Sequence, residues 1–140
     1  MTDDKALDVE RVGTNGSVSD EVVGRATERV YDLDERTARF GKMVIDFAKK
    51  VPFGPLTNRL IDQLIGAGTS VGANYCEADD AVSTKDFKHR ISYCKTEARE
   101  SKSFIRMIVR AVPELRESAK PVWQEAKELH LIFAKIYLNR

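Results

Sequence analysis

Apolar residues recur at alternating spacings of three and four positions along most of the chain after residue 33. Because an α-helix turns once every 3.6 residues, this spacing places them on one helical face. Prolines and glycines interrupt the pattern at "PFGP" and at Pro113, and Ser83 opens "STKD", which resembles a helix capping box. The pattern predicts four helices, which run from about Asp34 to Val51, from about Thr57 through Ala78, from Ser83 to Pro113, and onward from a start between Ser118 and Pro121.

No segment reads as a strand. Four helices with a hydrophobic period near 3.5 and short connections predict an all-α fold, an antiparallel up-down four-helix bundle formed by residues 31–140. The third helix has the longest core face, which consists of Phe87, Ile91, Cys94, Ala98, Ser101, Ile105, Ile108 and Val112. Residues 1–30 are predicted to form a flexible polar N-terminal arm with at most a short helix at 19–31.

The second predicted helix contains an unusual stretch, "GAGTSVGANYCEADD", at residues 66–80. Glycine inside a helix costs about 1 kcal/mol relative to alanine, so a close contact with another backbone must offset the loss. Gly68 and Gly72 lie on one flank of the core face, and Gly66 and Glu77 lie on the other. Small or apolar residues cover about half of the helix circumference or more, which is wider than one bundle core requires. Two interpretations follow: tight packing inside the bundle, or a subunit interface along one flank.

Asn74 and Glu77 belong to the same stretch and need polar partners if they are buried. A buried polar group without a partner costs about 1–3 kcal/mol. An antiparallel turn near Ser83 brings Glu77 roughly level with His89 and Arg90. We therefore expect a contact of Glu77 with Arg90 or His89, with a role in helix register and packing specificity.

These residues also carry a family resemblance. The pattern comprises Gly72-Ala73-Asn74, Glu77-Ala78, Ser83, Lys85-Asp86-Phe87 and Glu97-Ala98-Arg99-Glu100. It resembles the signature of the four helix bundle proteins that were first identified as open reading frames within intervening sequences of bacterial large-subunit ribosomal RNA genes. The segment "YDLDERTARFGKMVIDFAKKVP" is similar to one branch of that family, and the resemblance extends from Tyr31 to the C-terminus. Phe104 departs from it, because many relatives have Tyr-Trp near this point.

The resemblance implies an all-α bundle that assembles as a ring-like homo-oligomer, typically a homopentamer, without a well-defined activity for most members. One branch serves as the accessory protein of diversity-generating retroelements, where it binds nucleic acid and the reverse transcriptase. Such an assembly, and RNA, DNA or a reverse transcriptase as partners, are expectations that come from the resemblance.

Composition narrows the class of protein. Hydrophobic residues make up 42% of the chain and charged residues 32%, which is typical of a soluble globular domain. No apolar run approaches a membrane span, no signal-peptide core is present, and the two cysteines lack metal-ligand or CxxC spacing. These features predict a cytoplasmic protein that does not contact membrane. The net charge of +1 hides an asymmetry: residues 1–29 carry four basic and seven acidic residues, net −3, which leaves +4 for the rest.

An enzyme is not expected. The chain has no Glu-x-x-His pair, HExxH, P-loop or GxGxxG motif, so no metal or cofactor is predicted. His89 and His130 lie on different predicted helices without a matching ligand set. Cys76 and Cys94 are about 6 Å out of register along the predicted hairpin, which argues against a disulfide. The predicted hairpin brings Cys76 level with His89, as a catalytic nucleophile and its base would be, but no orienting group or oxyanion hole accompanies them.

The third helix carries an electrostatic signal. Between Lys85 and Arg110 it has eight basic and three acidic residues. Six of the basic residues fall within about 80° of one another and extend over about 33 Å, beside the apolar face. We call these six the basic stripe: Lys88, Lys95, Arg99, Lys102, Arg106 and Arg110. Like charges stack along it at i,i+4 spacing, which destabilises an isolated helix.

Two interpretations of the basic stripe lead to different functions. A row of cations suits phosphate backbones, and a ring of subunits would multiply it. Alternatively, the stripe is a solvated face that acids from another helix or subunit neutralise. We predict a non-enzymatic oligomeric bundle that binds RNA or DNA without sequence specificity. The alternative is a protein-interaction scaffold or accessory subunit, for example of a reverse transcriptase, without direct nucleic acid binding.

Overall fold

The computed structural model describes residues 32–139. The expected arm at 1–30 and the short helix at 19–31 lie outside these residues. Four long helices account for most of the described chain: α3 (Leu33–Ala48), α4 (Asn58–Asp79), α5 (Thr84–Ala111) and α6 (Arg116–Asn139). A single 3-10 turn, η2 (Pro113–Leu115), precedes α6, and residues 32–139 contain no strand. The predicted all-α class is confirmed.

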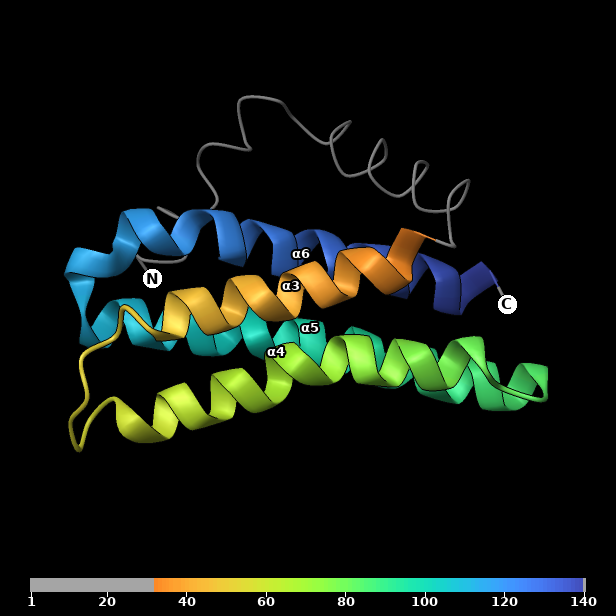
Figure 1. The fold of residues 1–140 in the computed structure, drawn as a ribbon. Helices are drawn as coiled ribbons and strands as arrows, with labels where there is room; N and C mark the ends of the chain where they lie inside the picture. The colour runs from red at the N-terminus through yellow and green to blue at the C-terminus, as the bar shows by residue number, and fades with distance from the viewer. Residues whose placement is uncertain (1–31, 140) are drawn as a thin grey trace, which may run out of the picture.

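Consecutive helices run in opposite directions, so α3 begins at the end of the bundle where α6 finishes (Figure 1). α4 packs against both α3 and α5, α5 also packs against α6, and α3 and α6 contact each other over a smaller surface. The described chain is therefore an antiparallel up-down four-helix bundle. α5, the longest helix, lies behind α4 in the view of Figure 1 and borders both α4 and α6.

The predicted core face of each helix points into the bundle. Phe40 of α3, Leu64 of α4, Ile91 of α5 and Phe133 of α6 are fully buried. Most other positions of the three-and-four pattern are buried too, whereas Met43, Leu60, Phe87 and Val112 are half-buried. Asn74 is an exception because it lies at the half-buried edge of this face. The core is wider than the pattern indicated, since it also takes in Tyr75, Trp123 and Ile132, which lie one position beside the predicted seam.

Local chemistry fixes the helix ends. The hydroxyl of Ser83 accepts a hydrogen bond from the backbone N–H of Asp86 at 3.0 Å, so the predicted N-cap of α5 is confirmed. α3 ends at Ala48, earlier than predicted, because the chain tightens into i→i−3 hydrogen bonds before Pro52. α6 begins at Arg116, also earlier than predicted. η2 leads directly into it, and Pro121 is accommodated inside the helix.

The glycines of α4 allow a close approach to α3. A Cβ atom built on Gly68 would lie 2.7 Å from a methyl carbon of Val44, and one built on Gly72 would lie 3.3 Å from the hydroxyl of Thr37. Tight packing inside the bundle is therefore the correct interpretation for these two positions. A Cβ on Gly66 would meet nothing within 4 Å, so the other flank of α4 stays open.

The polar residues of the same stretch differ from expectation. Asn74 donates to the carbonyl of Ser70 at 2.9 Å, and Arg90 donates to the side-chain oxygen of Asn74 at 3.4 Å. Glu77 is exposed and forms no ion pair with His89 or Arg90 within the described chain. The expected cross-hairpin contact thus exists between α4 and α5, but Asn74 makes it, since Glu77 points to solvent.

Candidate nucleic-acid interface

The basic stripe lies on the side of α5 that borders α6. Its first two members share one aromatic ring: the ammonium groups of Lys88 and Lys95 lie 5.0 and 5.5 Å from the ring centre of Tyr137, near the end of α6. A cation over an aromatic face is attracted by the negative charge of the ring, and each such contact contributes about 0.5–1 kcal/mol at exposed sites. Tyr137 therefore holds both ammonium groups along the seam between the two helices.

A second aromatic ring from α6 plays the same part in the middle of the stripe. The ammonium groups of Lys102 of α5 and Lys127 of α6 both lie 5.6 Å from the ring centre of Trp123. The side chain of Trp123 is only 3% exposed, so its ring is part of the core as well as a support for the two cations. Lys127 extends the positive charge from α5 onto α6.

His130 of α6 lies between these two supports. Burial lowers its pKa below the usual value, and the positive charges of Lys102, Arg99 and Lys95 lower it further. All three cations belong to the basic stripe. The charges of the stripe therefore lie close enough to the His130 ring to add to the effect of burial on its pKa.

The carboxylates of α6 face away from the stripe. Arg36 of α3 donates to Glu125 at 2.7 and 2.9 Å and to Glu128 at 2.9 Å, on the opposite flank of α6. Glu117, near the start of α6, pairs with Lys120 of the same helix at 3.1 Å. These three carboxylates of α6 are therefore engaged away from the basic stripe.

The acids of α5 lie on its other side. Asp86, Glu97 and Glu100 project about 120–180° from the centre of the stripe, toward the side that faces α4. Burial raises the pKa of Glu97, and the charge of Glu100 raises it further. α5 thus separates its charges, with cations on the α6 side and carboxylates on the α4 side.

The arginines at the far end of the stripe have different surroundings. Arg99 and Arg110 are exposed, whereas Arg106 is half-buried and its Nε is covered without a hydrogen-bond partner. Among residues 32–139, no carboxylate forms an ion pair with any of the three. Their guanidinium charge is available to an external anion.

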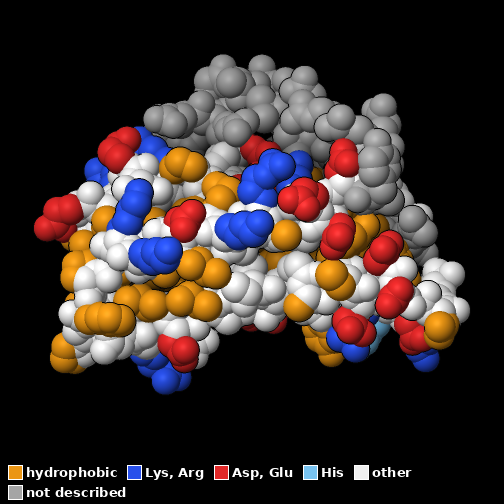
Figure 2. Space-filling view, viewed as in Figure 1, with side chains coloured by type: hydrophobic (Ala, Val, Ile, Leu, Met, Phe, Trp, Pro, Cys, Tyr) orange, Lys and Arg blue, Asp and Glu red, His pale blue; other side chains and the backbone are white. Residues whose placement is uncertain are grey.

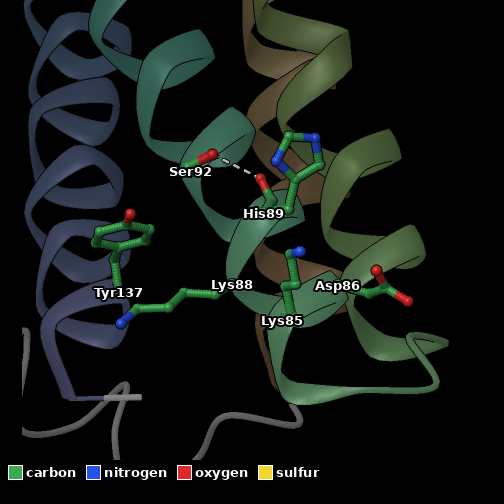
Figure 3. Close-up of a pocket in the computed structure, with 6 residues that line it drawn as sticks. All are labelled: Lys85, Asp86, Lys88, His89, Ser92 and Tyr137. Atoms are coloured by element: carbon green, nitrogen blue, oxygen red, sulfur yellow. Dashed lines mark hydrogen bonds between the residues drawn. The ribbon is translucent and has the colours of Figure 1, made fainter.

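A surface pocket of about 400 Å³ marks the opposite end of the stripe. Figure 3 shows it between the first turns of α5 and the last turn of α6, with Lys88 extended toward Tyr137 and Asp86 and His89 turned to the other side. Lys85 and Ser92 complete the lining. Two lysines here border an open space large enough for a small anionic group.

The face of the bundle formed by α3 and α4 has a different character (Figure 2). Acidic side chains gather toward the end where α3 begins and α4 finishes, and basic side chains lie mostly in the other half, where apolar side chains also gather near the passage from α3 into α4. Phe53 and Leu56 of that connection are 88% and 70% exposed, and Ile45 of α3 is also exposed.

Neither cysteine has the surroundings of a catalytic nucleophile. Cys94 is buried, donates to the carbonyl of Val71 at 3.6 Å, and has a pKa raised to about 12, mainly by burial. Cys76 is exposed, but its thiol donates to the carboxylate of Asp34 at 3.4 Å, which raises its pKa. Both thiols are free, as predicted. Cys76 therefore contacts an acid of α3, and not His89.

Two further features bear on the class of protein. Within residues 32–139, no group of three or more potential ligands is arranged to hold a metal ion. None of the described helices combines the length and the hydrophobicity that crossing a bilayer requires.

Four residues of this interface, all on α6, were not assigned to it from the sequence: Trp123, Lys127, His130 and Tyr137. They recur at spacings of four, three and seven, which is the signal of a shared helical face. That face is apolar at two of the four positions, so it reads as an edge of the core. Only the position of α6 beside α5 shows that it continues the basic stripe.

Comparisons with known proteins bear on the fold. No known family's sequence model matches the chain, and no curated protein matches it. Among solved structures, the bundle is similar to a protein of unknown function from the S23 ribosomal protein family of Bacteroides thetaiotaomicron. The two chains are 21% identical, the match covers 74% of this chain and 96% of the other, and the TM-score is 0.65. At this level of identity, the similarity establishes a shared helical-bundle fold.

Proposed function

We propose that this protein is a non-enzymatic nucleic-acid-binding bundle whose basic stripe on α5 contacts phosphates without reading sequence. The supporting observation is the seam between α5 and α6. There, Lys127 of α6 extends the positive charge of the stripe, while Glu125 and Glu128 face Arg36 on the far flank. A row of cations attracts a phosphate backbone, because binding releases the counterions condensed on that backbone.

The ring-like assembly that the sequence resemblance implies is part of this proposal. The open flank of α4, where Gly66 and Ala73 leave a flat exposed surface, provides room for a second subunit. A homopentamer would present the basic stripe five times. Membership in the four helix bundle family is supported by the sequence motif and by the fold shared with the S23 ribosomal protein family member. We place the protein in the cytoplasm on the basis of its sequence composition and its free thiols.

The alternative function is a scaffold or an accessory subunit, for example of a reverse transcriptase. It is favoured by the exposed apolar side chains of Phe53 and Leu56, in the connection between α3 and α4. Exposed apolar groups of this size are typical of protein contacts when they are clustered. Under this alternative, the basic stripe would face solvent and bind nothing.

A salt-dependent binding measurement distinguishes the two functions. Fluorescence anisotropy of labelled RNA and DNA would be recorded with the wild type and with the double variant Arg99→Gln/Arg110→Gln. These two arginines are exposed, so their replacement leaves the core intact. We expect the variant to lower the slope of log K against log salt by about 1.8 per subunit engaged, from roughly 0.9 per phosphate contact on duplex DNA.

The matched control is the double variant Arg39→Gln/Arg59→Gln, which removes the same charge from exposed positions on α3 and α4. It should leave the slope nearly unchanged, because those arginines lie outside the stripe. If both double variants change the slope equally, binding follows net charge and does not involve the stripe. If the wild type binds neither nucleic acid below about 100 μM at low salt, the scaffold function takes first place.

A further inference from the structure

The aromatic rings beside the basic stripe are occupied by the protein's own lysines. The ring of Tyr137 carries Lys88 and Lys95, and the ring of Trp123 carries Lys102 and Lys127. Trp123 is also 3% exposed. A nucleobase that stacked on either ring would have to displace lysine ammonium groups from it. The stripe therefore presents cations to a ligand and withholds its aromatic surfaces.

The exposed aromatic side chains of the described chain lie elsewhere. Tyr93 of α5 is 42% exposed, but it projects about 140° from the centre of the stripe and is already in edge contact with His89, with ring centres 4.7 Å apart. Phe53 belongs to the connection between α3 and α4. A strand bound along the stripe would reach neither ring, so these two side chains cannot serve it as stacking platforms.

This arrangement bears on the form of nucleic acid that the stripe can hold. Proteins that bind single strands without sequence preference combine a basic groove with aromatic platforms, and each stacked base contributes substantially to the affinity. A duplex keeps its bases stacked on one another and presents only phosphates and sugars outside its grooves. It also carries a higher density of charge than a single strand, so a row of cations releases more counterions from it.

The length of the stripe fits the same ligand. Its 22-residue span corresponds to about 33 Å along α5, close to the roughly 34–36 Å of one helical turn of a duplex. Four of the six cations are also held in place, because the two rings of α6 restrain Lys88, Lys95 and Lys102 and Arg106 packs against the bundle. A rigid row of this length matches a rigid rod-like ligand better than a flexible strand, which would lose conformational entropy on ordering.

We infer that the basic stripe is a docking surface for double-stranded nucleic acid, which it holds through the phosphates along about one helical turn, in preference to single strands. This inference rests on the proposed function and specifies its ligand. It assigns Tyr137 and Trp123 a positioning role, in which they hold lysine ammonium groups and do not touch bases.

The test compares ligands of equal charge with the full-length protein. Labelled duplex RNA and duplex DNA of about 20 base pairs, roughly two turns, would be titrated beside unstructured polypyrimidine single strands with the same total number of phosphates. We expect both duplexes to bind at least about tenfold more tightly than the single strands, with the steeper salt dependence of duplex contacts. Comparison of the RNA and DNA arms shows whether the stripe distinguishes the two duplexes.

Two readouts report on the rings directly. Trp123 is the single tryptophan of the chain, so its emission should not be quenched by base stacking when a duplex binds. The variant Tyr137→Leu removes the support of Lys88 and Lys95 and should weaken duplex binding by up to about threefold. Loss of a stacked base would weaken binding by about 5- to 150-fold. Val82→Leu, a substitution at an exposed residue outside the stripe, serves as the matched control.

The outcomes separate this inference from the proposed function. Single strands that bind as tightly as duplexes, or a fivefold or greater loss with Tyr137→Leu, would overturn the duplex preference and leave nucleic acid binding in place. A protein that binds neither form would overturn both. Duplex preference with a loss of at most about threefold in the Tyr137→Leu variant supports both.

Discussion

Arg36 of α3 donates two parallel hydrogen bonds to Glu125 of α6, from Nε at 2.7 Å and from Nη2 at 2.9 Å. The same Nη2 donates to Glu128, and the hydrogen bond with Glu125 is the largest of the effects that raise the pKa of Arg36. This cluster joins the first and last described helices, which contact each other over a smaller surface than the other neighbouring helices do. It also holds the two carboxylates on the flank of α6 that faces away from the basic stripe.

The variant Arg36→Met should therefore lower the free energy of unfolding by about 1.5–3 kcal/mol, since it leaves Glu125 and Glu128 without their shared donor. Urea denaturation monitored by circular dichroism measures this change. Arg39→Met is the matched control, because Arg39 is exposed on the same helix, and its effect should stay within about 0.5 kcal/mol. Equal effects of the two substitutions would show that the cluster contributes nothing.

Two glycines two positions apart should respond in opposite directions to alanine. Gly68→Ala places a methyl group 2.7 Å from a methyl carbon of the fully buried Val44, so we expect a loss of about 1–3 kcal/mol from overpacking. Gly66→Ala meets nothing within 4 Å and should gain about 0.5–1 kcal/mol from helix propensity. Thermal and urea unfolding of the pair test this. A stabilised Gly68→Ala variant would show that α3 and α4 do not approach closely.

His130 predicts a dependence of stability on pH. Its pKa is lowered in the folded protein, so between that pKa and the usual value of about 6.5 the unfolded chain binds more protons. Stability therefore rises with pH through this window, and the contribution is lost as the pH falls below about 6.5. Urea unfolding of the wild type and of His130→Gln across pH 5 to 8 measures it, and the variant should lack this slope.

The raised pKa of Glu97 has the opposite effect on stability at lower pH. Above the usual value of about 4.5, the folded protein binds more protons at this group than the unfolded chain does, so stability falls as the pH rises there. Glu97 contributes equally to both proteins, so the difference in free energy of unfolding between wild type and His130→Gln does not contain its contribution. An identical pH profile for the two proteins would contradict the placement of His130 beside the stripe. Nuclear magnetic resonance titration of the His130 ring gives the same pKa independently.

The two cysteines should differ in their reaction with a thiol reagent. Cys76 is exposed but its pKa is raised by Asp34, so its reaction at pH 8 should be slow, and Asp34→Asn should accelerate it by lowering that pKa. Cys94, buried and with a pKa of about 12, should react only when the protein unfolds. Cys76→Ser identifies the faster thiol. An Asp34→Asn variant that reacts no faster would show that the carboxylate does not hold the thiol.

The proposed ring predicts a mass well above that of a monomer in light scattering at micromolar concentration, with five subunits as the expected number. Ala73→Arg places a long charged side chain on the open flank of α4 and should reduce the mass. Ala38→Arg, the same substitution on an exposed position of α3, should leave it unchanged. A monomeric wild type would contradict the ring, and equal effects of the two substitutions would exclude the α4 flank as the interface.

Much of the fold followed from the sequence alone. The alternation of three and four predicted four helices, because burial of one helical face requires that period, and Phe40, Leu64, Ile91 and Phe133 are buried as it requires. Ser83 fixed the start of α5 through its hydroxyl, a purely local interaction. The early ends of α3 and the early start of α6 were less predictable, because a turn can add or remove residues at little energetic cost.

Only the tertiary structure decided what each helix face contacts. A helical wheel gives the direction in which Gly68, Asn74 or Lys95 projects from its own helix. Which neighbouring helix lies in that direction depends on whether the four helices follow one another in a left-turning or a right-turning arrangement. Packing selected the turn in which Gly68 lies under Val44 and Asn74 accepts from Arg90. The same choice placed the basic stripe beside the rings of α6. The row of cations was a property of the sequence, whereas its aromatic supports came from the packing of α5 against α6. The lysines of α5 and the rings of α6 are distant in the chain, so they meet only when the core forms.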